Sequence, residues 1–204
     1  MYNYKVYPVE KKVCLDLILK SHYLHRLPNI VHSFGLYENN EIKGICTFGI
    51  PASPQLCKGI CGTEYIQEVI ELNRFFLINN KKNLASFFVS KCLKLLPQPR
   101  IVVSYADTGA NHHGYIYQAC NFIYTGLSAK RMDADTDGHA RHGWKPNMKQ
   151  KERTRKHRYI YFCASKKDKK ERLRKMLYGI ENYPKGNNIN YTVKSIPPTQ
   201  PLLI

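Results

Sequence analysis

The stretch "IELNRFFLINNKKNLASFFVSKCLKLLPQPRIVVSYAD", residues 70–107, decides the fold of this chain. Its first part predicts an apolar central strand. After the polar turn at 79–83, apolar residues recur at helical spacing, at Leu84, Phe87, Phe88, Cys92, Leu95 and Leu96. Pro97 and Pro99 end this helix, and residues 100–107 are typical of a strand that is buried on both faces. A strand, a helix and a second strand in this order predict a parallel pair joined by a helical crossover.

The flanking segments add further strands and helices. The expected elements are an edge strand at 4–9, a helix from Val13 to about Leu27, a β-hairpin at 31–37 and 42–50, a proline-rich loop at 51–54, a short helix at 113–122, strands at 123–129 and 158–164, and a basic helix at 166–177. We therefore expect one α/β domain over residues 1–183, with a mixed central sheet flanked by helices. Residues 184–204, rich in Pro and Asn, are expected to form a poorly ordered tail.

The composition indicates a folded protein of a reducing compartment. Hydrophobic residues make up 43% and aromatic residues 12% of the 204, which is too much for a disordered chain. No apolar stretch is long enough to span a membrane or to form a secretory signal, so we expect a cytoplasmic protein. The seven scattered cysteines favour reduced thiols. Cys57 and Cys61 lack two further ligands for zinc nearby, and we interpret them as a loop or strand-edge pair.

The charge points to a polyanionic partner. The formal net charge is +17, and residues 145–175 contain fourteen Lys and Arg but three acidic residues. Aromatic residues that could stack on bases lie in or beside this run, at Trp144, Tyr159 and Tyr161. This pattern favours nucleic acid as the partner. The alternative is a solvated helix face beside a basic loop.

The turn from the first strand of the 70–107 unit into its helix could bind phosphate. A helix N-terminus presents free backbone N–H groups and the positive end of the helix dipole. The candidate residues for binding a phosphate-containing cofactor are Asn79, Lys81, Lys82, Asn83 and Ser86. The order of elements is similar to that of the GNAT acyltransferases, in which this turn is glycine-rich and binds the coenzyme A pyrophosphate. Glycines are absent here, and an ordinary helix cap with solvated lysines is the alternative.

Asp107 lies where the second strand of this unit ends, a common place for ligand sites in open α/β sheets. Its carboxylate could orient an amine, accept a proton or bind a metal, or it could simply cap the Asp-Thr-Gly turn. Four more side chains capable of such chemistry follow at His112, His113, Tyr115 and Tyr117. If the first helix crosses the sheet nearby, His22 in "KSHYLHR" (20–26) could join Asp107 in a metal site or an acid/base pair. Alternatively, the histidines of this cluster are hydrogen-bonded core residues.

Four motifs together resemble the phage Mom family of DNA modification proteins. They are "ELNRFFL", "SYAD", "HHGYIYQACNFIYTG" and "SHYLHR", and the resemblance extends from about Ser21 to Gly126. It implies a GNAT-like fold, double-stranded DNA as substrate, an acyl-CoA as donor and iron as the metal. The catalytic positions that it implies are Tyr23, Arg74, Ser104, Asp107 and Tyr117, with His22 and Asp107 as metal ligands and Asn73, Tyr105 and Tyr115 in substrate binding.

The expected function is therefore that of a phage-type enzyme in the bacterial host cytoplasm. It would add a carbamoylmethyl group to the exocyclic amine of adenine and protect the DNA from restriction. Such an enzyme must extrude the base from the duplex, and Tyr105, Tyr115 and Tyr117 would form the walls that hold it. The basic region 139–177 would contact phosphates, through Lys149, Arg153, Arg155, Lys156 and Arg158. Two alternatives are a GNAT acyltransferase acting on a protein or small amine, and a non-catalytic nucleic-acid-binding protein.

Overall fold

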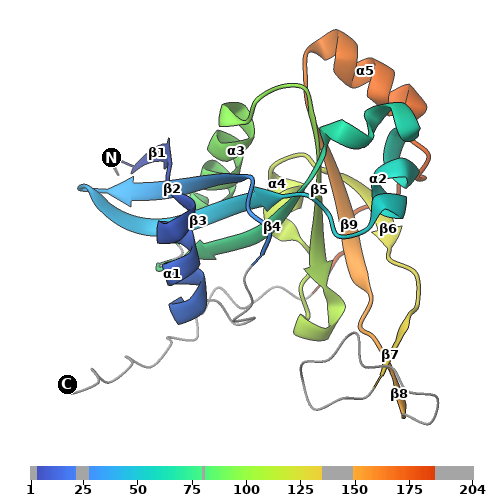
Figure 1. The fold of residues 1–204 in the computed structure, drawn as a ribbon, viewed down its shortest axis with the longest axis horizontal. Coiled ribbons are helices and arrows are strands. Elements are labelled where there is room, and N and C mark those ends of the chain that lie inside the picture. The colour runs from blue at the N-terminus through green and yellow to red at the C-terminus, as the bar shows by residue number, and fades with distance from the viewer. Residues whose placement is uncertain (1–3, 22–27, 80, 135–148, 187–204) are drawn as a thin grey trace.

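The computed structural model describes residues 4–21, 28–79, 81–134 and 149–186. Within these ranges a seven-stranded mixed sheet forms the centre of the molecule (Figure 1). The strands of this sheet, in spatial order, are β1 (Tyr4–Pro8), β2 (His32–Glu38), β3 (Glu41–Gly49), β4 (Val69–Leu77), β5 (Arg100–Asp107), β9 (Lys156–Cys163) and β6 (Ile123–Leu127). The short strands β7 (Met132–Ala134) and β8 (Gln150–Glu152) form a separate antiparallel pair beyond the sheet.

Seven helical segments complete the described part of the fold. They are α1 (Lys11–Ser21), α2 (Pro54–Cys61), the 3₁₀ turn η1 (Thr63–Glu68), α3 (Leu84–Leu95), the 3₁₀ turn η2 (Thr108–Ala110), α4 (Tyr115–Ala119) and α5 (Lys166–Lys175). The β4 and β5 strands pair in parallel and α3 connects them, as the sequence predicts, whereas the other pairs are antiparallel. The expected α/β architecture with a mixed sheet is confirmed.

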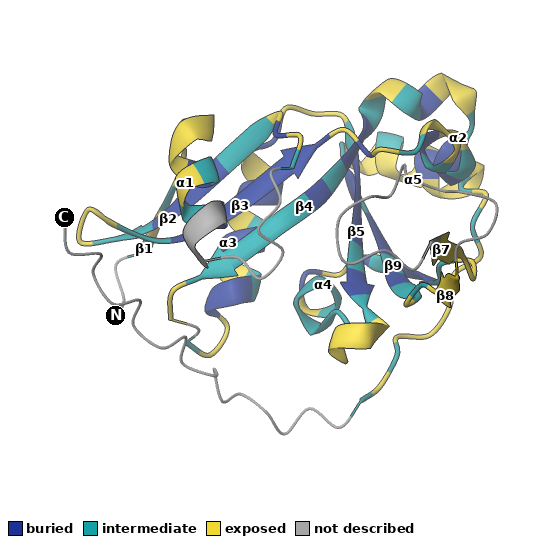
Figure 2. Cartoon of the chain, turned by 60° about the horizontal axis from the view of Figure 1, so that its bottom comes forward, coloured by how far each residue is buried: buried dark blue, intermediate teal, exposed yellow. Residues whose placement is uncertain are grey.

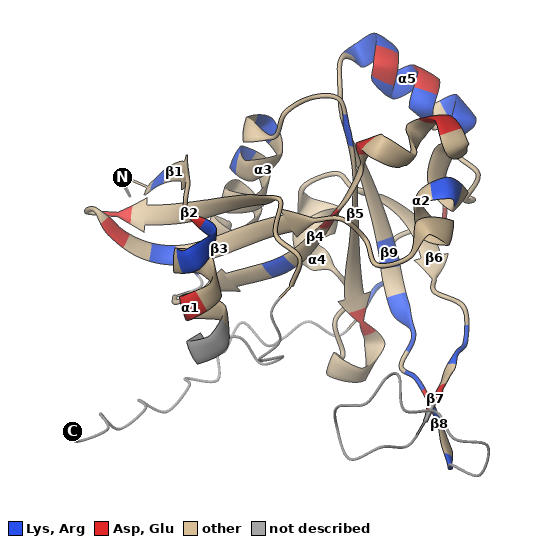
Figure 3. Ribbon diagram, in the orientation of Figure 1, with Lys and Arg blue, Asp and Glu red and all other residues tan. Residues whose placement is uncertain are grey.

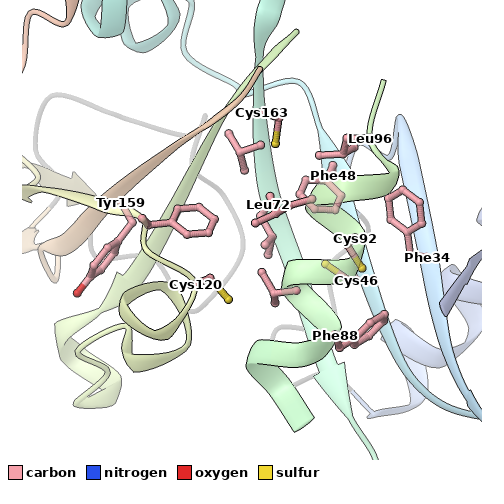
Figure 4. Close-up of a cluster of buried hydrophobic side chains, with 14 of the residues drawn as sticks. Phe34, Cys46, Phe48, Leu72, Phe88, Cys92, Leu96, Cys120, Tyr159 and Cys163 are labelled. Carbon is pink, nitrogen blue, oxygen red and sulfur yellow. The ribbon is translucent and has the colours of Figure 1, made fainter. Parts of the chain in front are cut away.

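The helices cover both faces of the sheet (Figure 2). On one face, Phe88 and Val89 of α3 pack with Leu72 and Val102, and Figure 4 shows this cluster between α3 and the strands. On the opposite face, α1 packs on β3, while Ile60 of α2 packs with residues of β4, β5 and β9. Burial on both sides explains why β5 reads as a continuous apolar run.

The helix α2 corrects one prediction. Residues 51–54 were expected to form a loop, with Cys57 and Cys61 as a loop or strand-edge pair. Instead, Pro54 begins a helix and the Ser53 hydroxyl caps it by accepting a hydrogen bond from the Leu56 amide, 3.3 Å away. Both cysteines are buried on this helix, so the interpretation of that pair was wrong. All seven cysteines are free thiols, as expected.

The C-terminal end of the described chain packs on α4. The expected tail was to start at Pro184, but the Gln118 amide donates to the Pro184 carbonyl at 3.2 Å and the Gly186 amide donates to the Tyr115 hydroxyl at 2.9 Å. Ordered contacts therefore continue to Gly186. Residues 187–204 lie outside the described residues, as does the predicted end of the first helix near Leu27. No helix in the described ranges is long and apolar enough to span a membrane.

Candidate active site

The β4 and β5 strands separate in the middle of the sheet. They pair only where Val69–Glu71 faces Ile101–Val103, and beyond this point the two ribbons diverge (Figure 2). At the junction, the buried Ser104 hydroxyl donates a hydrogen bond to the Leu72 carbonyl, 3.1 Å away. A side-chain hydroxyl thus bonds the β4 backbone at the point where the pairing of β4 and β5 stops. The separation lies at the carboxyl ends of the parallel strands, where open α/β sheets bind ligands.

A bulge in β4 ties a distant segment to this place. The register between β3 and β4 shifts between Thr47, opposite Arg74, and Phe48, opposite Leu72, so that Asn73 is the extra residue of β4. The Thr47 hydroxyl donates to the Asn73 side-chain oxygen at 2.6 Å, and the Asn73 amide donates to the Asn29 carbonyl at 2.7 Å. Gly49 allows this approach, because a Cβ there would clash with the Asn29 carbonyl. Asn73, predicted to bind substrate, therefore also anchors the chain that follows residues 22–27.

Two predicted site residues, His22 and Tyr23, belong to the segment 22–27. His22 and Tyr23 lie outside the described residues, so the predicted metal pair of His22 and Asp107 stays a prediction. Among the described residues, no three His, Cys, Asp or Glu side chains come together in a way that could hold a metal ion. Asp107 alone does not make a metal centre.

Successive residues of β5 face opposite sides of the sheet. Val102 and Ala106 pack in the cluster under α3, and Tyr117 of α4 packs against that same cluster. Tyr105, by contrast, packs against the cluster under α2. Alternation along a strand therefore puts Tyr105 and Tyr117 on opposite faces, and the structure does not bring them together as the walls of one pocket. Their binding roles remain predictions.

Asp107 lies at the end of β5, on the face that carries Tyr105. It caps η2 by accepting a hydrogen bond from the Gly109 amide at 2.9 Å. Its other carboxylate oxygen lies 3.7 Å from the Lys156 ammonium of β9, and both side chains are about one-third exposed. Asp107 is thus a turn cap, as one reading of the sequence had it, and its second oxygen remains accessible for chemistry.

Glu71 is a further acidic residue at the junction that the sequence did not single out. Burial raises the pKa of its carboxyl group, although Lys156 and Arg74 lower it in part. Burial also raises the pKa of Tyr105, and the charge of Glu71 raises it further. Within the described ranges, no hydrogen bond or ion pair joins the Glu71 side chain to another residue. A single acid inside an apolar strand was the available signal, because such a group is costly to bury without a ligand or partner.

The other predicted catalytic and substrate-binding residues line the same region on either face. Arg74 follows the bulge in β4, and its guanidinium donates to the Asn73 carbonyl at 2.7 Å. The Tyr117 ring packs on Phe122 and Tyr159, with ring centroids 5.4 and 5.3 Å away. The Tyr115 hydroxyl donates to the Gly186 carbonyl at 2.9 Å, so the C-terminal segment already holds this side chain.

The predicted cofactor-binding turn leads into α3. Asn83 precedes the helix in a left-handed conformation, φ 63°, and its side chain forms no capping hydrogen bond. The Ser86 hydroxyl donates to the Asn83 carbonyl at 3.1 Å, and the Lys81 ammonium lies 3.3 Å from the Glu38 carboxylate. Asn79 and Lys82 are exposed. The first turn of α3 therefore leaves its amides uncapped by the Asn83 side chain, which suits an anionic ligand.

The described basic residues lie in two parts of the molecule. The β7–β8 hairpin and α5 lie at opposite ends of β9 (Figure 3). The eight residues of β9 span roughly 25 Å at about 3.3 Å per residue. Among the described residues, the predicted contact region 139–177 thus has basic side chains toward both ends of β9. Residues 139–148 lie outside the described residues, and the single contact region stays a prediction.

Several of the predicted phosphate contacts have partners within the protein. Arg153 lies 3.8 Å from the Asp133 carboxylate, and Arg155 donates to the Ser128 carbonyl at 2.7 Å. Arg158 donates to the hydroxyl and carbonyl of Thr125, both at 2.9 Å, and its guanidinium covers the Tyr178 ring at 3.5 Å. Lys149, by contrast, is exposed. The hairpin lysines are therefore better placed to reach a partner than Arg158.

A hollow of about 240 Å³ lies elsewhere, at the outer edge of the sheet. It is lined by Lys5, Tyr7, Tyr37, Asn39 and Asn40, and none of the predicted site residues borders it. We place the candidate site at the separation of β4 and β5, because the half-buried carboxyl group of Glu71 and the strand-end carboxylate of Asp107 lie there.

The mixed sheet with its separating parallel pair is of the GNAT acetyltransferase type. Arabidopsis thaliana NAA60 in complex with acetyl-CoA is similar in fold, with a TM-score of 0.52 and 13% identity over 78% of this chain and 99% of that one. A GNAT family acetyltransferase from Bacillus cereus has a TM-score of 0.44 and 12% identity, over 78% of this chain and 96% of that one.

The sequence comparison is more specific. The model of the Mom protein family matches residues 3–185, and the chain belongs to this family. The methylcarbamoylase mom of Escherichia phage Mu is 26% identical over 190 residues, which cover 83% of this chain and 78% of that protein. The resemblance inferred from the four motifs is confirmed, and it extends well beyond residues 21–126.

Proposed function

We propose that this protein is a phage-type DNA-modifying transferase that adds a carbamoylmethyl group to the exocyclic amine of adenine in double-stranded DNA. The observation that carries the proposal is the Asp107 carboxylate at the end of β5, beside the separation of β4 and β5, in a chain of the Mom protein family. The name of the phage Mu relative, a methylcarbamoylase, supports the transferred group. In a phage-infected bacterium such a change would protect the DNA from restriction.

The geometry suggests what the residues do. The duplex hides the amine of adenine, so the base must be extruded before it reacts. Asp107 would then accept a hydrogen bond from the amine and take its proton as the new C–N bond forms. The leaving group departs from the donor with the electrons of the broken bond. The capping bond from Gly109 fixes the carboxylate, so Asp107 is oriented before the substrate arrives.

An acyl-CoA is the proposed cofactor. The GNAT-like fold and the acetyl-CoA named for the NAA60 complex support this choice. Attack on its thioester carbonyl would give an N-acyl adenine, so the carbamoylmethyl group must be transferred through its methylene carbon, whose bond to the leaving group breaks as the new C–N bond forms. The phosphates would bind at the N-terminus of α3, through Asn79, Lys81, Lys82, Asn83 and Ser86. If iron is bound, Asp107 and His22 are the proposed ligands, and the metal would activate the donor as a Lewis acid. Metal analysis of the purified protein, wild type and His22→Ala, tests that ligand directly.

The proposed function is tested by mass spectrometry of nucleosides from DNA of bacteria that express the protein. We expect an adenosine heavier by one carbamoylmethyl group, and we expect Asp107→Asn to abolish it. Asp16→Asn is the matched control, because Asp16 is exposed on α1, away from β5. Unmodified adenosine with the wild-type protein would refute the proposal. Acyl transfer to a polyamine or peptide would then favour a conventional acyltransferase.

A further inference from the structure

The position of Lys156 differs from that expected of a lysine that contacts DNA phosphates. It pairs with Asp107 in the register of β5 and β9, and only about one-third of its side chain is exposed. Its ammonium lies 3.7 Å from the Asp107 carboxylate. This separation is too long for a hydrogen bond, so both groups keep capacity for a third group between them.

Two carboxylates flank this ammonium. Asp107 lies at the end of β5, and Glu71 of β4 lies near enough for Lys156 to lower the pKa of its carboxyl group. A DNA phosphate that approached Lys156 would also approach both negative charges, which would repel it. Lys149 and Lys151 of the hairpin region are more exposed, although Asp133 pairs with Lys151 in the register of β7 and β8. A neutral ligand with its own donor and acceptor fits the position of Lys156 better.

We propose that Lys156 and Asp107 read the edge of the extruded base and thereby select adenine over guanine and thymine. Lys156 would donate a hydrogen bond to the ring nitrogen next to the exocyclic amine, while Asp107 accepts one from the amine itself. Lys156 is then a specificity-determining residue. This inference rests on the proposed function, because it assumes that the base enters the candidate site.

The chemistry of the two groups determines which one donates and which one accepts a hydrogen bond. An ammonium only donates hydrogen bonds, and an ionised carboxylate only accepts them. Adenine presents an amine donor beside a ring nitrogen acceptor, which matches this pair. Cytosine presents the same pattern, so the pair rejects guanine and thymine, and the size of the ring system has to reject cytosine. Guanine and thymine present a carbonyl where adenine has its amine. Either base would set an acceptor against the Asp107 carboxylate and leave it without a donor, which is costly for a partly buried charge.

Base analogues in a DNA duplex test this reading. The purified full-length protein is given duplexes in which the target adenine is replaced by 1-deazaadenine or 7-deazaadenine, each lacking one ring nitrogen beside the amine. We expect one analogue to slow the wild type by roughly 10- to 150-fold, the factor that a hydrogen bond to a charged group is worth. Lys156→Met should be slower on adenine by a similar factor, and that analogue should slow it no further.

Three controls separate the possible explanations. Lys94→Met removes one exposed charge from α3 and should behave as wild type. Lys156→Arg keeps a charged hydrogen-bond donor, so the deazaadenine analogue that slows the wild type should also slow this variant, by a smaller factor. The slope of log affinity against log salt for duplex binding should be the same for Lys156→Met and wild type.

Either of two outcomes would overturn the inference while leaving the proposed function intact. One is that Lys156→Met still shows the full analogue penalty. The other is that it modifies adenine at the wild-type rate while its salt slope falls by about one unit, as loss of a phosphate contact predicts. If the wild type modifies no adenine at all, the proposed function itself fails, and the inference fails with it.

Discussion

Replacing Ser104 by alanine tests the junction at which β4 and β5 separate. The Ser104 side chain is fully buried, and its hydroxyl donates to the Leu72 carbonyl at 3.1 Å. Alanine removes the donor and leaves the carbonyl buried. A buried acceptor without a partner costs about 1–3 kcal/mol. In a domain of this size each kcal/mol lowers the melting temperature by about 2–4 °C, so the Ser104→Ala variant should melt roughly 2–12 °C lower.

Thermal unfolding followed by circular dichroism measures this shift, and Ser90→Ala provides the matched control. The Ser90 hydroxyl donates to the Cys120 sulfur at 3.4 Å from a half-buried position, and sulfur is a weak acceptor, so its loss should matter less. DNA modification by Ser104→Ala, assayed well below its melting temperature, should stay near the wild-type rate. An unchanged melting temperature together with a loss of activity of tenfold or more would refute this reasoning. The hydroxyl would then act in the chemistry, as the family resemblance implies.

Three further predictions concern pH, an ion pair and salt. Burial and the neighbouring His113 lower the pKa of His157 below 6.5, so the unfolded chain takes up a proton at a higher pH than the folded chain does. The free energy of unfolding should therefore fall as the pH drops through 6.5. The His157→Asn variant should show a weaker pH dependence in thermal melts from about pH 7.5 to about pH 5. Arg172→Met breaks a buried two-point ion pair with Glu68, at 2.6 and 2.7 Å, and should cost about 3–5 kcal/mol in chemical denaturation, whereas the exposed Lys175→Met should cost far less. Lys151→Gln should reduce the salt slope of duplex binding by about one unit while the binding preference among sequences is unchanged.

Local periodicity was enough to predict the centre of the fold. The change from an apolar strand to helical spacing at Leu84, and back to a strand at Arg100, identified the parallel pair and its crossover. The helix α2 was missed because two prolines close together favour a loop. Its start was nevertheless encoded, since Ser53 before Pro54 is the usual pairing of a capping residue with proline in the first helical turn.

The candidate site was predictable only in part. Asp107 could be found because a strand end and an acid coincide in the sequence. The alternation of β5 could also have shown that Ser104 and Tyr105 face opposite sides. Glu71 could have been noticed as a single acid inside an apolar strand, but Lys156 could not, because its significance comes from the pairing of β5 with β9. A lysine inside a basic run looks like its neighbours until the carboxylate beside it is known.

The structure also changes what the net charge implies. Of the two basic surfaces, the hairpin adjoins the end of β9 at which Lys156 pairs with Asp107, whereas α5 adjoins the opposite end (Figure 3). On α5, the Arg172 guanidinium already forms an ion pair with Glu68 within the protein. A duplex that delivers a base to Asp107 would therefore meet the hairpin first, and its lysines should dominate the salt dependence. In the proposed function, the long basic run would combine charges with two roles: exposed ones would hold DNA near the site, and partly buried ones, such as Lys156, would act within it.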